Sequence, residues 1–249
     1  MLSIEHVAKQ FRNLNFSGLA DTLNKLISDA EMHQHSYLQF ANLLIEQEIN
    51  TRNEKRLITN KRNAAFPIEK SLDEFDYKFQ TTITKRQVNQ LLDFNFIDNR
   101  DNLIFIGPPG VGKTHISIGV GLKAINAGYK VMFISALELN EMLELAEIKG
   151  MLKKQISAIC KYDLVIIDEL GYLPMNQQSN HNFFQLIHTL YEFRSIIITT
   201  NKDFTQWGDF FSDSNVAVPI IDRVIHHSQI FILGGESYRL KHKLSQQQN

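Results

Sequence analysis

Hydrophobic and polar positions follow two different patterns along the chain, and the change comes near residue 66. Before it, apolar side chains such as Leu38, Leu43 and Ile49 recur at helical spacing in a stretch that lacks glycine and proline. After it, short apolar runs rich in β-branched and aromatic residues alternate with longer amphipathic segments, such as 136–147 and 180–193. The pattern predicts a helical N-terminal region followed by a domain of alternating strands and helices.

The apolar runs begin at residues 102, 130, 163, 195 and 229, and hydrophobic side chains follow one another in them without alternation. Such runs are typical of parallel strands whose two faces are both covered by helices. We therefore expect a three-layer α/β domain built on a five-stranded parallel sheet.

The domain organisation follows from the breaks in these patterns. Pro67 and the acidic, aromatic segment 71–79 interrupt the helical spacing and predict a linker or a clamp onto the next domain. We expect four parts, which are a small helical N-terminal domain at 1–65, the linker or clamp at 66–80, the α/β domain at 81–244 and a disordered polar tail at 245–249.

Composition narrows the setting of the protein. The 249 residues carry 26 basic and 27 acidic side chains, so the net charge of −1 argues neither for nor against nucleic acid. Cys160 is the sole cysteine, which excludes an internal disulfide and fits a reducing compartment. The N-terminal stretch holds Glu5, His6 and Lys9 where a secretory peptide needs apolar residues, and no run reaches the roughly 18 apolar residues of a membrane helix. We expect a cytoplasmic protein without membrane association.

A glycine-rich motif lies between the first predicted strand and the helix after it. Gly107 to Thr114 have the pattern G-x-x-x-x-G-K-T, which in this context predicts a phosphate-binding loop. Its backbone N–H groups and the helix N-terminus would hold a β-phosphate, Lys113 would reach the β- and γ-phosphates, and the Thr114 hydroxyl would complete a Mg²⁺ shell. The expected nucleotide-binding residues are Gly107, Pro108, Pro109, Gly110, Val111, Gly112, Lys113, Thr114 and His115. The expected ligand is a nucleoside triphosphate.

Polar side chains also follow two other predicted strands. Asp168 and Glu169 end the run that begins at 163, where Asp168 would hold Mg²⁺ through water and Glu169 would deprotonate the attacking water. Without a phosphate loop nearby, two acidic residues after a strand would more often belong to a solvated turn. Asn201 ends the run that begins at 195 and could bond the γ-phosphate and the water, or could be an ordinary turn residue.

Arg223 lies in an apolar helical segment that two histidines follow. It could pair with Asp222 on the surface, or it could cross a subunit interface and stabilise charge on a neighbour's γ-phosphate. The residues alone favour the ion pair. His226 and His227 have no matching ligands at metal-binding spacing, so we predict no structural metal.

The ordered set of motifs is more specific than any one of them. Between Phe66 and Lys243 the chain contains "SLDEFDYKFQ", "GPPGVGKTH", "YDLVIIDELGYLP", "IITTN", "WGDFF", "DRVIHH" and "GESYRLK". In this it resembles the IstB-like ATP-binding proteins, the helper ATPases of IS21-type transposition, which belong to the AAA+ superfamily beside the DnaC-type helicase loaders. The resemblance implies a P-loop AAA+ domain with strand order 5-1-4-3-2, Asn201 as a γ-phosphate sensor and Arg223 as an arginine finger acting in trans.

The same resemblance implies partners that composition does not indicate. They are ATP as substrate, double-stranded DNA bound with little sequence preference, a transposase, and further copies of the chain in an ATP-dependent homo-oligomer. Candidate DNA contacts are the basic residues Arg52, Lys55, Arg56, Lys61 and Arg62, and the pair Lys153 and Lys154. Alternatively, such basic runs only form a solvent-exposed face of a helix. Arg239 could be a second nucleotide sensor or an anchor of the tail.

We therefore interpret the sequence as that of an ATPase that assists a transposase in DNA transposition. One alternative is a DnaC-like replicative helicase loader, which would share the nucleotide chemistry. Another is a nonhydrolysing, nucleotide-gated DNA-binding scaffold, against which the intact pair Asp168 and Glu169 argues.

Overall fold

The computed structural model describes residues 3–172, 175–211 and 214–241, with side chains in the last range described from 218 onward. Contacts divide the chain into two compact units, Met1–Thr59 and Asn60–Asn249. The domain boundaries expected from the sequence stay a prediction, and the expected disordered tail at 245–249 lies outside the described residues.

The first unit is helical. It contains α1 (Ile4–Asn13), α2 (Ser17–Met32) and most of α3 (Tyr37–Ala64), whose last residues belong to the second unit. Ser3 caps α1, because its hydroxyl accepts the N–H of His6. A Cβ on Gly18 would lie 2.5 Å from the side chain of Thr51, so α2 and α3 approach as closely as they do because this position is glycine. A small core of Ala8, Ala20 and Leu23 holds the unit together.

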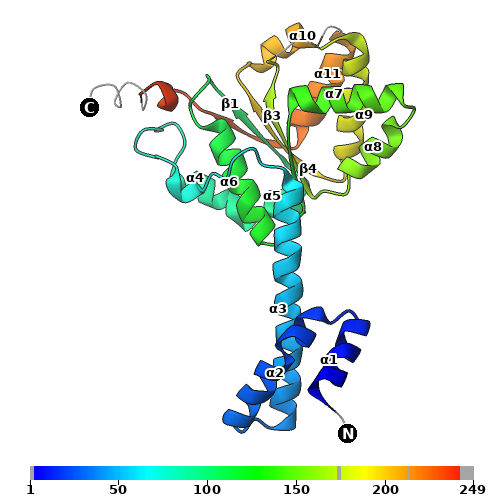
Figure 1. Ribbon diagram of the computed structural model, residues 1–249. Coiled ribbons are helices and arrows are strands. Elements are labelled where there is room, and N and C mark those ends of the chain that lie inside the picture. The colour runs from blue at the N-terminus through cyan, green and yellow to red at the C-terminus, as the bar shows by residue number, and fades with distance from the viewer. Residues whose placement is uncertain (1–2, 173–174, 212–213, 242–249) are drawn as a thin grey trace. The chain divides into compact units, whose positions relative to one another are not determined.

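The second unit is built on a five-stranded parallel sheet (Figure 1). Its strands are β1 (Asn102–Ile106), β2 (Val131–Ser135), β3 (Leu164–Leu170), β4 (Ser195–Thr200) and β5 (Ser228–Ile232). The order across the sheet is β2-β3-β4-β1-β5, which is the expected order 5-1-4-3-2 read from the other edge. The predicted strands, their parallel pairing and their order are confirmed.

Helices cover both faces of the sheet (Figure 1). One face carries α6 (Lys113–Asn126) with the short elements η1 (Leu72–Glu74), α4 (Lys85–Gln90), η2 (Leu91–Asp93) and α5 (Asn95–Asp98). The other carries α7 (Ala136–Ile148), α8 (Leu152–Ile159), α9 (Gln177–Leu190), α10 (Trp207–Phe210) and α11 (Ser214–His226), with η3 (Phe204–Gln206) before α10.

Alternate residues of the central strands therefore enter two different hydrophobic clusters. In β1, Leu103 and Phe105 pack on the α6 side, whereas Ile104 packs on the α7–α11 side. In β4, Ile197 and Ile198 divide in the same way. Each such side chain contributes about 1.5–3 kcal/mol of hydrophobic stabilisation when it is fully buried. Burial on both faces explains why the sequence shows continuous apolar runs instead of alternation.

The parallel arrangement decides where a ligand can bind. The carboxyl ends of all strands lie at one edge of the sheet, and the segments that follow β1, β3 and β4 meet there.

In the part of the chain that is described, no helix combines the length and apolar character needed to cross a bilayer.

Candidate functional site

The phosphate-loop motif forms the turn between β1 and α6. Gly110 and Gly112 have φ of +85° and +102°, in the left-handed region that favours glycine. A Cβ on Gly110 would lie 2.1 Å from Ser237 Oγ, and one on Gly112 would lie 2.6 Å from the ring of Phe75. Both backbone conformation and close approach therefore require glycine at these two positions.

Lys113 is the first residue of α6, and its side chain lies back over the loop. Its Nζ donates to the carbonyl oxygens of Gly107 at 2.6 Å and Pro108 at 2.9 Å. Burial lowers the pKa of its ammonium group, the carboxylates of Asp168 and Glu169 oppose this effect, and Arg239 adds to it. A half-buried cation held by neutral carbonyls is well placed to exchange them for phosphate oxygens.

Thr114 and Asp168 join the phosphate loop to β3. The Thr114 hydroxyl lies 2.9 Å from Oδ1 and 3.1 Å from Oδ2 of Asp168, whose exposed fraction is 7%. Hydroxyl and carboxylate oxygens are the ligands that Mg²⁺ prefers, directly or through water. The donor set at this point therefore fits Mg²⁺.

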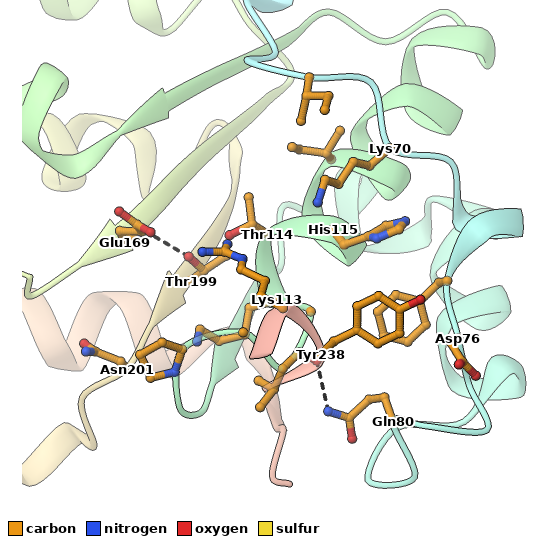
Figure 2. Close-up of a pocket in the computed structure, with 18 of the residues that line it drawn as sticks. Lys70, Asp76, Gln80, Lys113, Thr114, His115, Glu169, Thr199, Asn201 and Tyr238 are labelled. Atoms are coloured by element: carbon orange, nitrogen blue, oxygen red, sulfur yellow. Dashed lines mark hydrogen bonds between the residues drawn. The ribbon is translucent and has the colours of Figure 1, made fainter. Parts of the chain in front are cut away.

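Glu169 occupies an irregular position in β3. The pairing with β4 shifts there, since Ile167 faces Ile198 but Leu170 faces Thr200. Glu169 itself has φ of +60°, an unusual value for a residue other than glycine. Its N–H donates to Thr199 Oγ1 at 2.9 Å, while its side chain is exposed (Figure 2). The shift thus turns the carboxylate out of the sheet toward the cavity.

A cavity of about 510 Å³ lies over these residues, within the range of small-molecule sites. The linker, the phosphate loop, the ends of β3 and β4, and the C-terminal segment all line it. Figure 2 shows Lys113 and Thr114 in the middle of the site, with Glu169 and Asn201 on one side and Gln80 and Asp76 on the other. The volume and the mixed polar and aromatic lining suit a nucleotide.

The linker region closes one side of the cavity. Gln80 is 4% exposed, and its Nε2 donates to the carbonyl oxygens of Val111 and Gly234, each at 3.0 Å. His115 Nε2 donates to the Ser71 carbonyl oxygen at 2.7 Å. The segment after Pro67 is therefore hydrogen-bonded both to the phosphate loop and to the residues that follow β5. The sequence pattern gave no sign of this role for Gln80.

The structure brings most of the predicted site residues together. Those that line the cavity are Pro109, Gly110, Val111, Gly112, Lys113, Thr114, His115, Glu169, Asn201 and Arg239. Gly107 and Pro108 adjoin it through Lys113, and Asp168 adjoins it through Thr114. The roles assigned to these residues stay predictions.

The ion pair between Arg223 and Asp222 that the residues alone favoured does not form, although the structure describes both side chains. The guanidinium donates to the Pro219 carbonyl oxygen at 3.0 Å and lies 5.3 Å from the centre of the Phe184 ring, and no pair with Asp222 forms among the described side chains. Neighbouring residues on a helix point in different directions, which explains why the ion pair does not form. Arg223 also stays outside the cavity of its own chain.

The candidate DNA contacts are exposed and lie outside the cavity. Some already have intramolecular partners, since Arg52 pairs with Glu48 at 2.7 Å and Lys61 with Glu69 at 2.8 Å. Lys55 Nζ also donates to Ser17 Oγ at 2.6 Å. The other members of the two groups are Arg56, Arg62, Lys153 and Lys154. Exposure fits a binding surface and a solvated helix face equally well.

A second histidine group lies in the first unit. The potential ligand atoms of Asp29, His33 and His35 lie within 4.8 Å of one another, a grouping that the sequence analysis did not consider. The rings of His226 and His227 lie 4.2 Å apart. The expectation of no structural metal stays a prediction.

Comparison with known proteins places the chain among related sequences. A family model described as "IstB-like ATP binding protein" matches residues 9–246. "Insertion sequence IS5376 putative ATP-binding protein" of Geobacillus stearothermophilus is 38% identical over 98% of this chain and 97% of its own length. "Insertion sequence IS21 putative ATP-binding protein" of Pseudomonas aeruginosa is 37% identical over 92% of this chain and 87% of its own length.

Two solved structures share the fold of the second unit. The DnaC helicase loader superposes with a TM-score of 0.52 at 20% identity and covers 59% of this chain and 86% of its own. AMPPCP-bound DnaA from Aquifex aeolicus gives 0.55 at 22% identity, covering 73% of this chain and 56% of its own. At such identities, these two likenesses concern the fold alone.

Proposed function

Because the chain belongs to the IstB-like ATP-binding proteins, and its second unit has the AAA+ P-loop fold, we propose that it binds and hydrolyses ATP to assist a transposase on double-stranded DNA. The family supports ATP as the nucleotide. Hydrolysis, Mg²⁺, DNA and the transposase are the further parts of the proposal.

One observation carries the hydrolytic part. The Thr114 hydroxyl bonds to Asp168 at 2.9 Å, and the next residue, Glu169, presents an exposed carboxylate to the same cavity. A protein that only stores a nucleotide needs no free carboxylate beside the metal-binding pair, whereas hydrolysis needs a group that takes a proton from water. The arrangement of these three residues therefore favours an ATPase over the nonhydrolysing scaffold.

The proposed reaction uses the chain's own groups as follows. Lys113 exchanges the carbonyls of Gly107 and Pro108 for β- and γ-phosphate oxygens, where its charge compensates theirs. Thr114 and Asp168 would hold Mg²⁺, which when bound neutralises charge on the phosphates. Glu169 accepts a proton as the water oxygen bonds to the γ-phosphorus, and the bond to the bridging oxygen breaks so that ADP leaves with its electron pair.

Asn201 and Arg223 complete the proposed chemistry from different places. Asn201 lines the cavity, where its amide can bond both the γ-phosphate and the attacking water. Arg223 is half-buried away from its own cavity, so we assign it to the active site of a neighbouring copy in a homo-oligomer. Full turnover then requires assembly.

The names of the relatives support the transposase as a partner, and exposed basic residues support DNA. The relatives above 30% identity are named as proteins of insertion sequences, which favours transposition over helicase loading. The exposed basic residues of α3, Arg56 and Arg62 among them, supply cations for DNA phosphates.

The proposal is tested by titrating fluorescent duplex DNA with the full-length protein in ATP, AMPPCP, ADP or no nucleotide. We expect tight binding with ATP and AMPPCP, release as ATP is consumed, and capture of an IS21-type transposase only in the bound state. An affinity for DNA that is the same with ATP, with ADP and without nucleotide would contradict the proposal. Capture of a replicative helicase in place of the transposase would favour the loader.

A further inference from the structure

The Thr199 hydroxyl lies between the two acidic residues of β3. Thr199 is fully buried, its Oγ1 donates to Asp168 Oδ1 at 2.5 Å, and the same oxygen accepts the N–H of Glu169 at 2.9 Å. A hydroxyl has one hydrogen and two lone pairs, so these two contacts fix its orientation. The geometry links the carboxylate of one residue to the backbone of the next.

The strand pairing explains why a side chain is needed here. Since Ile167 faces Ile198 and Leu170 faces Thr200, Asp168 and Glu169 lie together opposite Thr199. An extra residue in one strand leaves a ladder N–H without its regular carbonyl partner. The Thr199 hydroxyl takes the N–H of Glu169 in place of that carbonyl.

The same hydroxyl stabilises an uncommon backbone turn. Glu169 has φ of +60°, which residues other than glycine adopt only when their surroundings hold them there. Beyond it, Thr200 Oγ1 donates to the Leu170 carbonyl oxygen at 2.7 Å and fixes the strand exit. The direction of the Glu169 side chain therefore depends on contacts from β4.

We propose that Thr199 is a positioning residue whose single hydroxyl sets both the Asp168 carboxylate and the turn that presents Glu169 to the cavity. This inference rests on the proposed function, because it assigns Asp168 to Mg²⁺ and Glu169 to water. It couples the two tasks, since movement of the metal-binding carboxylate is transmitted through one oxygen to the general base.

Replacement of Thr199 separates this role from packing. Thr199→Val keeps the shape of the side chain but removes the donor to Asp168 and the acceptor for Glu169, whereas Thr199→Ser keeps the hydroxyl. We expect Thr199→Val to lower kcat by about tenfold or more, with ATP affinity changed by less than about threefold, and to raise the Mg²⁺ concentration for half-maximal rate. Thr199→Ser should stay within about threefold of wild type.

Ser195 provides the matched control. It is also fully buried on β4, and its hydroxyl donates to the Phe96 carbonyl oxygen at 2.9 Å, at the opposite end of the strand from the cavity. Ser195→Ala should lower Tm while kcat and the Mg²⁺ midpoint stay unchanged. Thr199→Ala is measured in parallel, because it removes the same hydroxyl without introducing a second methyl group, and we expect the effects of Thr199→Val.

A binding measurement separates this inference from the proposed hydrolysis. The affinity for AMPPCP is measured with Mg²⁺ and with EDTA; the gain that Mg²⁺ gives the wild type should shrink in Thr199→Val and persist in Thr199→Ser. If Mg²⁺ raises the AMPPCP affinity of a wild type that does not hydrolyse ATP, the proposed hydrolysis is wrong. The comparison of AMPPCP affinity with Mg²⁺ and with EDTA then still tests the role of Thr199. Unchanged kcat and an unchanged Mg²⁺ gain in folded Thr199→Val and Thr199→Ala would overturn the role of Thr199, even if both variants lose stability.

Discussion

Thr114 Oγ1 lies 2.9 Å from Oδ1 of Asp168, although the two residues are 54 positions apart in the chain. The contact joins the first turn of α6 to the carboxyl end of β3, so the phosphate loop and the acidic strand form one site. A cation bound there would be held by the Thr114 hydroxyl and the Asp168 carboxylate together. The proposed nucleotide chemistry depends on this pair.

Lys113→Ala should abolish nucleotide binding. The substitution removes the only charge that the loop itself contributes near the β- and γ-phosphates, and charge-assisted bonds of this kind are the strong ones. We expect ATP affinity to fall by about 100-fold or more in calorimetry, and ATP-dependent oligomers to disappear in light scattering. Lys149→Ala, an exposed lysine outside the cavity, should behave as wild type. Oligomers that persist with ATP in Lys113→Ala would contradict the assignment.

Asp168→Asn should make nucleotide binding insensitive to Mg²⁺. The neutral amide still accepts a bond from Thr114 but no longer compensates a divalent cation. Wild-type affinity for ATP should drop when EDTA replaces Mg²⁺, whereas the variant should show the same affinity in both. Asp163→Asn is the control, since Asp163 accepts the N–H of Lys130 at 2.9 Å at the other end of β3. A variant that retains the full Mg²⁺ effect would remove Asp168 from the metal site.

Two inactive variants should restore activity when they are mixed. Arg223→Ala lacks the proposed finger and Glu169→Gln lacks the proposed base, so each alone should hydrolyse ATP slowly while binding it within about threefold of wild type. In a mixed oligomer, the intact Glu169 of one copy meets the intact Arg223 of the next. Phosphate release should rise toward a fraction of the wild-type rate; no recovery, in mixtures shown to contain both variants in one oligomer, would argue against action in trans.

DNA binding should weaken steeply with salt, and less steeply when basic residues of α3 are removed. Each cation that contacts a phosphate releases about one counterion, so Arg56→Ala together with Arg62→Ala should lower the slope of log K against log salt by about 1 to 2. The measurement is fluorescence anisotropy with ATP at several salt concentrations. Lys85→Ala, on α4, controls for general loss of charge. An unchanged slope would leave these arginines as a solvated helix face.

Local sequence signals predicted the framework of the site. The five strands and the phosphate loop follow from apolar runs and from a motif whose residues are neighbours in the chain, whereas the strand order was implied by the resemblance to the IstB-like proteins. Long-range pairing could not be predicted in this way. The contact of Gln80 with Gly234 spans 154 residues, and the position of Thr199 beneath Glu169 depends on a register shift between β3 and β4. Neither β3 nor β4 alone contains a signal for that shift.

Arg223 shows the same limit. An acidic neighbour in the sequence predicted an ion pair, but the guanidinium turns along α11 toward Pro219 and across to Phe184 on α9. Its partners are set by helix geometry and tertiary packing.

If Glu169 is the base that takes a proton from the attacking water, its removal should stop ATP hydrolysis and leave ATP binding intact. ATP affinity and the rate of phosphate release are measured with Mg²⁺ and duplex DNA for wild type, Glu169→Gln and the control Glu192→Gln, which changes an exposed carboxylate outside the cavity. We predict equal affinities within about threefold, and a release rate that falls about 100-fold or more in Glu169→Gln only. Release by Glu169→Gln at the wild-type rate would show that Glu169 is not the base, and ATP binding by the wild type without any release would show that the protein is not an ATPase.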